Sequence, residues 1–314
     1  MTDSPESASE KSPALVSGGI NFPIVDTHQH LWDLQRFELP WLNADREYPP
    51  GEHPLGRSHL PHDYLTAAHG LGIVKTIYME VDVAVDQQAD EMEYVTALCE
   101  DPGNPMAGAV VSSRPGEAGF GDWVRKLARN RWIKGVRRVL HANDTPPGLC
   151  KSQAFIRSLQ ELGEYGLSFD FCIRPTELLD AAEVAKACPE TRFILDHCGN
   201  LPVHGASDEL RQTWQEGMLA LAECENVVCK ISGIVASARD ENWNLDDLRP
   251  VVDGTLDAFG PDRVMFASDW PVCTLRSSLS RWVDALRTIV ENRPLLEQRR
   301  LFHDNAVRFY GLES

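Results

Sequence analysis

Short apolar runs alternate with longer amphipathic runs along most of this chain. The apolar residues of the longer runs recur every three to four positions, which is typical of helices packed on one face. The regular order of short and long runs indicates βα units and a parallel sheet. The short runs predict eight strands, at Ile24–His30, Thr76–Val81, Ala107–Ser112, Gly135–Leu140, Ser168–Ile173, Arg192–His197, Val227–Ser232 and Val264–Asp269.

A helix is predicted after each strand. The helices cover Pro61–Gly70, Gln87–Glu100, Asp122–Asn130, Ala154–Tyr165, Glu177–Ala187, Asp208–Glu223, Leu248–Phe259, Ser280–Glu291 and Leu295–Phe309. Eight such units predict a (β/α)8 TIM barrel, an α/β fold, as a single domain over residues 21–314 with an extra C-terminal helix. An open doubly wound sheet fits less well, because no Gly-x-Gly-x-x-Gly motif follows the first strand.

Two segments lie outside this repeat. Residues 1–20 are polar and Ser-rich, which predicts a disordered tail without the apolar core of a signal peptide. Residues 31–60 make a much longer connection than a usual βα loop and carry Trp32 and Trp41. We expect this loop after the first strand to be a lid or pocket wall, or a packed Ω-loop that covers the mouth of the barrel.

Composition narrows the class of protein. The 314 residues are 43% hydrophobic, enough for a large core, and the formal net charge of −17 disfavours nucleic acid and anionic membranes as partners. No apolar run approaches the roughly 20 residues that span a bilayer. The eight cysteines form no Cys-x-x-Cys pair, so we expect reduced thiols and a cytoplasmic protein. Its oligomeric state stays open.

Polar residues recur at the C-terminal ends of the predicted strands, where barrels of this type place their chemistry. His28 and His30 share one face of the first strand, because side chains alternate along a strand. His197 ends the sixth strand, Asp269 ends the eighth, and Glu80 lies at the end of the second. An isolated His-x-His pair is as readily a wet strand edge as a binding pair. The polar residues at the ends of the other strands favour a binding or catalytic site.

Several basic residues predict a cationic rim that binds a carboxylate or the hydroxyls of a sugar acid. They are Arg137, Arg138, His141, Arg174 and Lys230. Only one of the adjacent Arg137 and Arg138 can point inward. Lys230 is at least as well explained by an ion pair in the barrel wall, and Glu80 by pairing with an arginine as by metal or hydroxyl binding. Trp41 is a further candidate for the pocket wall.

Three motifs together resemble the amidohydrolase superfamily. They are Val-Asp-Thr-His-Gln-His-Leu-Trp-Asp at 25–33, Leu-Asp-His-Cys-Gly-Asn at 195–200 and Ser-Asp-Trp-Pro-Val at 268–272. They are most similar to the amidohydrolase-2 branch, which includes L-fuconolactonase, L-rhamnonolactonase and 2-pyrone-dicarboxylate lactonase. The resemblance extends over residues 22–312.

The resemblance implies a role for each matching residue. Asp269 would take a proton from water and return it to the leaving alkoxide. His28, His30 and His197 would polarise the carbonyl, either directly or through one divalent metal, Zn²⁺ or Mn²⁺, held with Asp269 or Glu80. A two-metal site is not expected, because the fifth strand carries no histidine. No organic cofactor is expected.

We therefore predict a metal-assisted or metal-independent hydrolase of carbohydrate metabolism. Its expected partner is a small molecule, the lactone of a sugar acid or a related carboxylated lactone. Two alternatives stay open. One is a metal-dependent decarboxylase of a carboxylated aromatic acid, and the other is a barrel that binds a sugar acid without turning it over. The intact Asp269 and histidine pair disfavour the second.

Overall fold

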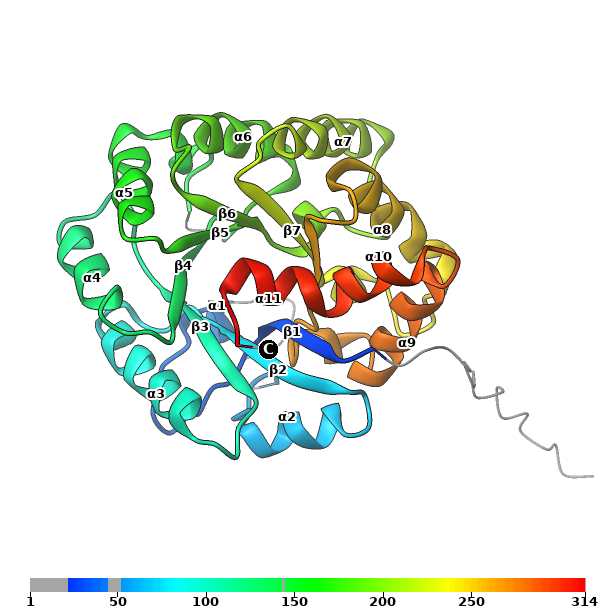
Figure 1. The fold of residues 1–314 in the computed structure, drawn as a ribbon, viewed down its shortest axis with the longest axis horizontal. Helices are drawn as coiled ribbons and strands as arrows, with labels where there is room; N and C mark the ends of the chain where they lie inside the picture. The colour runs from blue at the N-terminus through cyan, green and yellow to red at the C-terminus, as the bar shows by residue number, and fades with distance from the viewer. Residues whose placement is uncertain (1–21, 45–51, 143–144, 314) are drawn as a thin grey trace, which may run out of the picture.

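The computed structural model describes residues 22–44, 52–142 and 145–313, and the segment 1–20, expected to be a disordered tail, lies outside them. Eight parallel strands form one sheet in chain order, with helices around it (Figure 1). Each strand begins and ends within three residues of its expected bounds. The strands are β1 (Ile24–Gln29), β2 (Ile73–Met79), β3 (Met106–Ser112), β4 (Ile133–Val139), β5 (Ser168–Cys172), β6 (Arg192–Leu195), β7 (Val227–Ile231) and β8 (Val264–Phe266).

The sheet closes on itself, which confirms the predicted barrel. Gln29 pairs in parallel with Trp270 beyond the end of β8. The backbone N–H of His30 donates to the carbonyl of Trp270 at 2.8 Å, and that of Asp269 donates to the carbonyl of His28 at 2.9 Å. These bonds fix the ends of β1 and β8 beside each other.

Helices α2 to α9 cover the outside of the barrel, α1 lies in the connection after β1, and α10 and α11 lie across one end (Figure 1). The helices are α1 (Pro40–Ala44), α2 (Pro61–Ala68), α3 (Gln88–Glu100), α4 (Phe120–Leu127), α5 (Gln153–Glu164), α6 (Leu178–Ala187), α7 (Asp208–Ala222), α8 (Leu245–Phe259), α9 (Leu279–Val290), α10 (Leu295–Arg299) and α11 (Asn305–Tyr310). Because helices cover one face of the strands and the barrel interior the other, β1 and β5 are buried at every position.

The long connection after β1 packs on the barrel. It contains the short helix α1, which the hydrophobic pattern did not predict. Trp32 is buried, and its indole N–H donates to the carbonyl of Arg57 at 2.7 Å. The indole N–H of Trp41 donates to the carbonyl of Val81 at 2.8 Å, so the connection is fastened to the end of β2.

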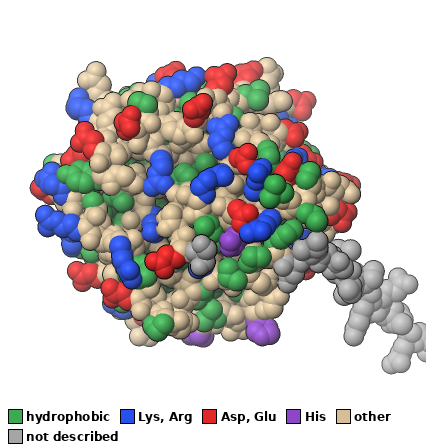
Figure 2. Space-filling view, in the orientation of Figure 1, with side chains coloured by type: hydrophobic (Ala, Val, Ile, Leu, Met, Phe, Trp, Pro, Cys, Tyr) green, Lys and Arg blue, Asp and Glu red, His purple; other side chains and the backbone are tan. Residues whose placement is uncertain are grey.

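The C-terminal helices close the opposite end of the barrel. The helix expected over Leu295–Phe309 is divided by a π-helical turn at Arg300–Asp304. The side-chain amide of the buried Asn305 donates to the carbonyls of Pro261 and Val264, both at 2.8 Å, at the start of β8. Tyr310 packs with barrel-interior residues such as Met79. Figure 2 shows basic and acidic side chains interspersed over this face.

The C-terminal ends of the strands are therefore the end of the barrel that these helices leave uncovered. The described part of the chain contains no helix with the length and apolar character needed to cross a membrane.

The carboxyl group of Asp26 joins β1 to the end of β8. It accepts bonds from the backbone N–H of Ser268 at 2.8 Å and the hydroxyl of Tyr64 at 2.7 Å. Asp26→Ala would leave both buried donors without an acceptor, so we expect it to lower the free energy of unfolding by about 2–4 kcal/mol. Urea denaturation measures this loss, and Asp26→Asn, which keeps an acceptor oxygen, serves as the control. An Asp26→Ala protein as stable as wild type would show that Asp26 does not stabilise the junction between β1 and the end of β8.

Candidate active site

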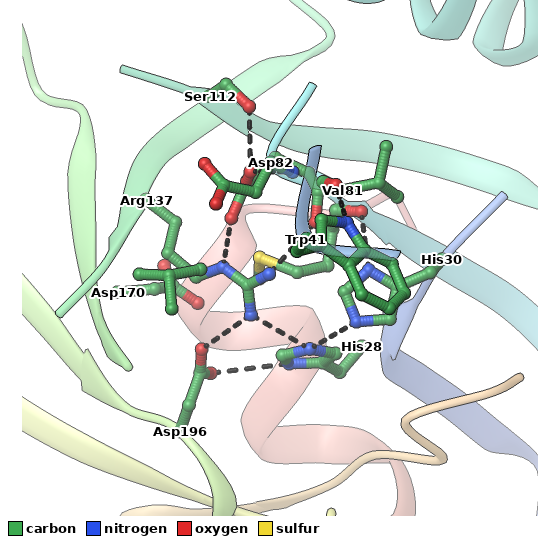
Figure 3. Close-up of polar contacts among 12 residues, drawn as sticks. His28, His30, Trp41, Val81, Asp82, Ser112, Arg137, Asp170 and Asp196 are labelled. Carbon is green, nitrogen blue, oxygen red and sulfur yellow. Dashed lines mark hydrogen bonds and ion pairs between the residues drawn. The ribbon is translucent and has the colours of Figure 1, made fainter. Parts of the chain in front are cut away.

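Two histidines converge at the end of β1. His28 and His30 point to the same side, and their Nε2 atoms lie 3.1 Å apart (Figure 3). Both side chains are buried. The alternation of side chains along a strand produces this pairing, as the His-x-His spacing predicts.

The partners of the two rings fix which nitrogen carries hydrogen. His30 Nδ1 lies 3.0 Å from the carbonyl oxygen of Met79, which only accepts, so Nδ1 is the donor. His28 Nδ1 faces a carboxylate oxygen of Asp196 at 3.3 Å. In neutral rings Nε2 of His30 therefore carries a lone pair. Nε2 of His28 carries one as well, because NH1 of Arg137, 3.2 Å away, can only donate to it. Burial lowers the pKa of His28 well below 6.5, although Asp196 opposes the shift, so His28 is neutral at pH 7.

Asp269 completes a triangle with these two nitrogens. Its Oδ1 atom lies 3.3 Å from Nε2 of His30 and 3.6 Å from Nε2 of His28. The backbone of Asp269 is left-handed, with φ of 56°, a conformation that is sparsely populated outside glycine and clusters at active sites. The hydrogen bond to the carbonyl of His28 holds it there.

His197 lies beside His28, with their ring centroids 4.5 Å apart. Its Nδ1 atom is 2.9 Å from the hydroxyl of Ser232, which donates or accepts. When Ser232 donates, Nε2 of His197 carries the hydrogen, so His197 is the ring of the three that offers a donor. Burial lowers its pKa, although Asp269 and Asp196 oppose the shift.

A buried arginine faces the histidine pair from β4. Nε of Arg137 donates to Glu80 at 2.6 Å, and the two terminal nitrogens reach the Glu80 carbonyl at 2.9 Å and the Asp196 carboxylate at 3.3 Å. Its NH1 atom also lies 3.2 Å from Nε2 of His28. Burial by itself would lower the pKa of Arg137, but Glu80 and Asp196 raise it well above its usual value, so the charge persists.

Asp196 binds a second buried cation from β7. Nζ of Lys230 lies 3.3 Å from Asp196 and donates to Asp170 at 2.6 Å. Lys230 is wholly buried, and the carboxylates raise its pKa against the effect of burial. Its position is that of an ion pair in the barrel wall, away from any exposed surface.

Glu80 does not face the triangle. Besides Arg137, it accepts from the hydroxyl of Ser112 at 2.7 Å and from the backbone N–H of Asp82 at 2.6 Å. Burial by itself would raise the pKa of Glu80, but Arg137 and these hydrogen bonds lower it. Glu80 is therefore an ionised partner of Arg137.

The other predicted rim residues do not contact the triangle. Arg138 points away from the barrel axis and pairs with Glu117 at 3.1 Å. Arg174 donates to three carbonyls of the β4 to α5 connection and to Glu177 at 2.8 Å. His141 is exposed, but surrounding protein and the positive charge near it lower its pKa to about 4. Trp41 is half-buried, with its N–H already bound to Val81.

Sequence reasoning missed two supporting residues. Asp196 precedes His197 within the motif at 195–200, and an acidic residue at the end of an apolar strand was the available signal. Nothing in the sequence around Gly233 indicated a role at the site. Its φ is 68°, and a Cβ atom there would lie 2.5 Å from Nδ1 of His197.

The triangle of ligand atoms fits one divalent cation. Tetrahedral zinc with bonds of about 2.0–2.1 Å holds its ligand atoms roughly 3.3 Å apart. The three sides of the triangle, which joins His28, His30 and Asp269, are 3.1, 3.3 and 3.6 Å. Ligand atoms of His28, His197 and Asp269 also lie within 4.8 Å of one another. The surroundings of the rings fit as well, because Nδ1 of His30 donates to the carbonyl of Met79 and Nδ1 of His28 faces the carboxylate of Asp196 at 3.3 Å.

Comparison with known proteins identifies relatives over almost the whole chain. The family model described as "Amidohydrolase" matches residues 25–312. An uncharacterized protein of Sinorhizobium fredii is 30% identical over 91% of this chain and 98% of its own length. An L-fucono-1,5-lactonase of Burkholderia multivorans is 27% identical over 92% of this chain and 96% of its own length.

A solved structure is similar over the same range. The crystal structure of an amidohydrolase from Burkholderia multivorans with bound zinc has a TM-score of 0.80 and 26% identity, and the match covers 93% of this chain and 100% of that one. A similar barrel therefore holds zinc, and this chain has a His/Asp group that can hold a cation.

Gly233 leaves the space that the His197 ring occupies. We expect Gly233→Ala to displace the ring and shift its ¹⁵N resonances, assigned with a His197→Asn spectrum. Gly70→Ala is the matched control, because Gly70 has a similar φ of 79° with nothing within 4 Å of its added Cβ. Both variants lose about 1 kcal/mol to left-handed strain. Unchanged His197 resonances in Gly233→Ala would show that the ring does not depend on this glycine.

Proposed function

Because the chain belongs to the amidohydrolase family, we propose that it is a lactonase, an enzyme that adds water to the ester of a sugar lactone and opens the ring. The observation that carries the proposal is the Asp269 carboxylate, 3.3 Å from His30 and beside His197, at the catalytic end of the barrel. Similarity to a protein named L-fucono-1,5-lactonase supports the same class of reaction.

Asp269 has the chemistry that water activation requires. Its carboxylate takes a proton from water as the water oxygen attacks the lactone carbonyl carbon. The tetrahedral intermediate then collapses, and the bond between the carbonyl carbon and the ring oxygen breaks. Asp269 returns the proton to the departing alkoxide. The product is an open-chain hydroxy acid, and the side chain is regenerated.

His197 is the candidate that stabilises the oxyanion. With Ser232 donating to Nδ1, Nε2–H of His197 is available to the carbonyl oxygen as negative charge develops there. Fixed donors of this type contribute about 100- to 1,000-fold to the rate of acyl transfer. Gly233 and Ser232 hold the ring in place.

The same groups would hold a metal. His28, His30 and Asp269, with His197 beside them, would bind one Zn²⁺ or Mn²⁺ ion. Such an ion acts as a Lewis acid that polarises a carbonyl oxygen. Zinc in the similar amidohydrolase structure supports this assignment.

The charge balance of the strand ends favours a neutral sugar lactone over a carboxylated ring. Among the described residues, the cations expected to bind a carboxylate already have acidic partners. These pairs are Arg137 with Glu80, Arg138 with Glu117, Arg174 with Glu177 and Lys230 with Asp170. We propose that His141, neutral at pH 7, and Trp41 contact hydroxyls and the sugar ring. The same balance disfavours decarboxylation of an aromatic acid.

The proposed setting is carbohydrate metabolism in the cytoplasm. The eight cysteines are unpaired and buried, as expected for a reducing compartment. A lactone that forms by oxidation of a sugar is hydrolysed by such an enzyme to the open acid.

The proposal predicts that Asp269→Asn lowers kcat by at least about 100-fold, because asparagine cannot accept the proton. KM should change little, since the amide has the shape of the carboxylate. Proton release from a panel of 1,5- and 1,4-aldonolactones, corrected for spontaneous hydrolysis, measures both parameters.

A carboxylated pyrone and a carboxylated aromatic acid complete the panel. We expect slower turnover of the pyrone than of the best neutral lactone, and no carbon dioxide from the acid. Wild type that accelerates no lactone would overturn the proposed function. Equal rates for wild type and Asp269→Asn would remove Asp269 from the mechanism.

A further inference from the structure

We propose that Arg137 is a fixed competitor of the metal, which keeps the affinity of this site for a divalent cation low. Its guanidinium occupies the lone pair of His28 that a metal would use. The inference rests on the cation site of the proposed function and does not depend on the identity of the substrate.

The contested atom is Nε2 of His28. In a neutral ring the lone pair lies on Nε2, because the guanidinium nitrogen beside it can only donate. NH1 of Arg137 lies 3.2 Å from this atom and carries only hydrogens to donate. One lone pair cannot both accept this hydrogen bond and ligate a metal. Metal binding at His28 therefore requires NH1 to withdraw.

Arg137 is anchored against such a withdrawal. Its side chain is only 5% exposed, and Glu80 holds it through both the carboxylate, at 2.6 Å, and the backbone carbonyl, at 2.9 Å. Glu80 is fixed in turn by Ser112 and by the backbone of Asp82. Moving Arg137 would leave buried carboxylates without their cation, which is strongly unfavourable.

Electrostatic repulsion acts in the same direction. A metal about 2.1 Å from Nε2 of His28 would lie no more than about 5.3 Å from NH1, the sum of the two distances. Two like charges at this separation repel each other, and burial weakens the screening by water. Without metal, Arg137 supplies a permanent positive charge beside the same imidazole.

The test measures zinc affinity without substrate. Chelator-stripped wild type, Arg137→Met and the double variant Glu80→Gln/Arg137→Met are titrated with Zn²⁺ against a chromogenic chelator. The double variant removes both members of the buried pair, so it tests the proposal if Arg137→Met alone does not fold. We expect both variants to bind Zn²⁺ at least tenfold more tightly than wild type.

Arg138→Gln is the matched control. Arg138 is the next residue of the same strand, but it pairs with Glu117 outside the barrel. The zinc affinity of the Arg138→Gln variant should equal that of wild type. Co²⁺ absorption spectra of the same proteins report whether the bound metal has gained a ligand after Arg137 is removed.

Unchanged or weaker zinc binding in the folded Arg137 variants would overturn the proposal, and weaker binding would mean that Arg137 positions His28 for the metal.

A crystal structure of zinc-loaded wild type gives a second test. We expect NH1 to have left His28 when the metal is on Nε2. An intact 3.2 Å contact between NH1 of Arg137 and Nε2 of His28, beside a bond from zinc to the same Nε2, would contradict competition between Arg137 and the metal. Neither result depends on lactone hydrolysis. The zinc measurements therefore test the role of Arg137, and the proton-release panel separately tests the proposed lactonase function.

Discussion

The carboxylate of Asp196 joins the parts of this site. From the end of β6 it lies 3.3 Å from a side-chain nitrogen on each of three other strands, His28 on β1, Arg137 on β4 and Lys230 on β7. Burial by itself would raise the pKa of Asp196, but Lys230 and His28 lower it well below its usual value, so it stays ionised. A single buried anion thus faces one imidazole and holds two cations in place. Loss of this anion would leave Arg137 with Glu80 and Lys230 with Asp170 as their remaining carboxylates, an unfavourable change for two buried cations.

Rigid strands and unusual strand ends act together around Asp196. The barrel fixes the backbones, and the left-handed conformations of His197 and Asp269 then set where the acid and the imidazole lie. Closure between β1 and β8 holds Asp269, and the absence of a side chain at Gly233 makes room for His197. Functional geometry in this barrel therefore depends on the backbone conformation of the motif residues and on Gly233, which lies outside the three motifs.

The sequence predicted the eight strands closely because each buried strand is a short apolar run with a polar residue where it ends. The same reasoning brought His28, His30, His197 and Asp269 to one rim, where the structure has them close together. The sequence pattern did not predict which polar side chains bind each other. Glu80 and Arg137 are 57 positions apart, and strand alternation places both at the rim but does not predict the ion pair between them. The pairing of Arg138 with Glu117 depends on a loop whose path no periodicity encodes.

The central claim is that water activated by Asp269 attacks the carbonyl carbon of a lactone. A single turnover in ¹⁸O-labelled water with excess enzyme, followed by mass spectrometry of product and protein, tests it most directly. We expect one ¹⁸O atom in the carboxylate of the product and none in the hydroxyl released by ring opening. Label in that hydroxyl, or in the side chain of Asp269, would contradict it, because the first means attack at the alkyl carbon and the second means a covalent acyl–aspartate intermediate.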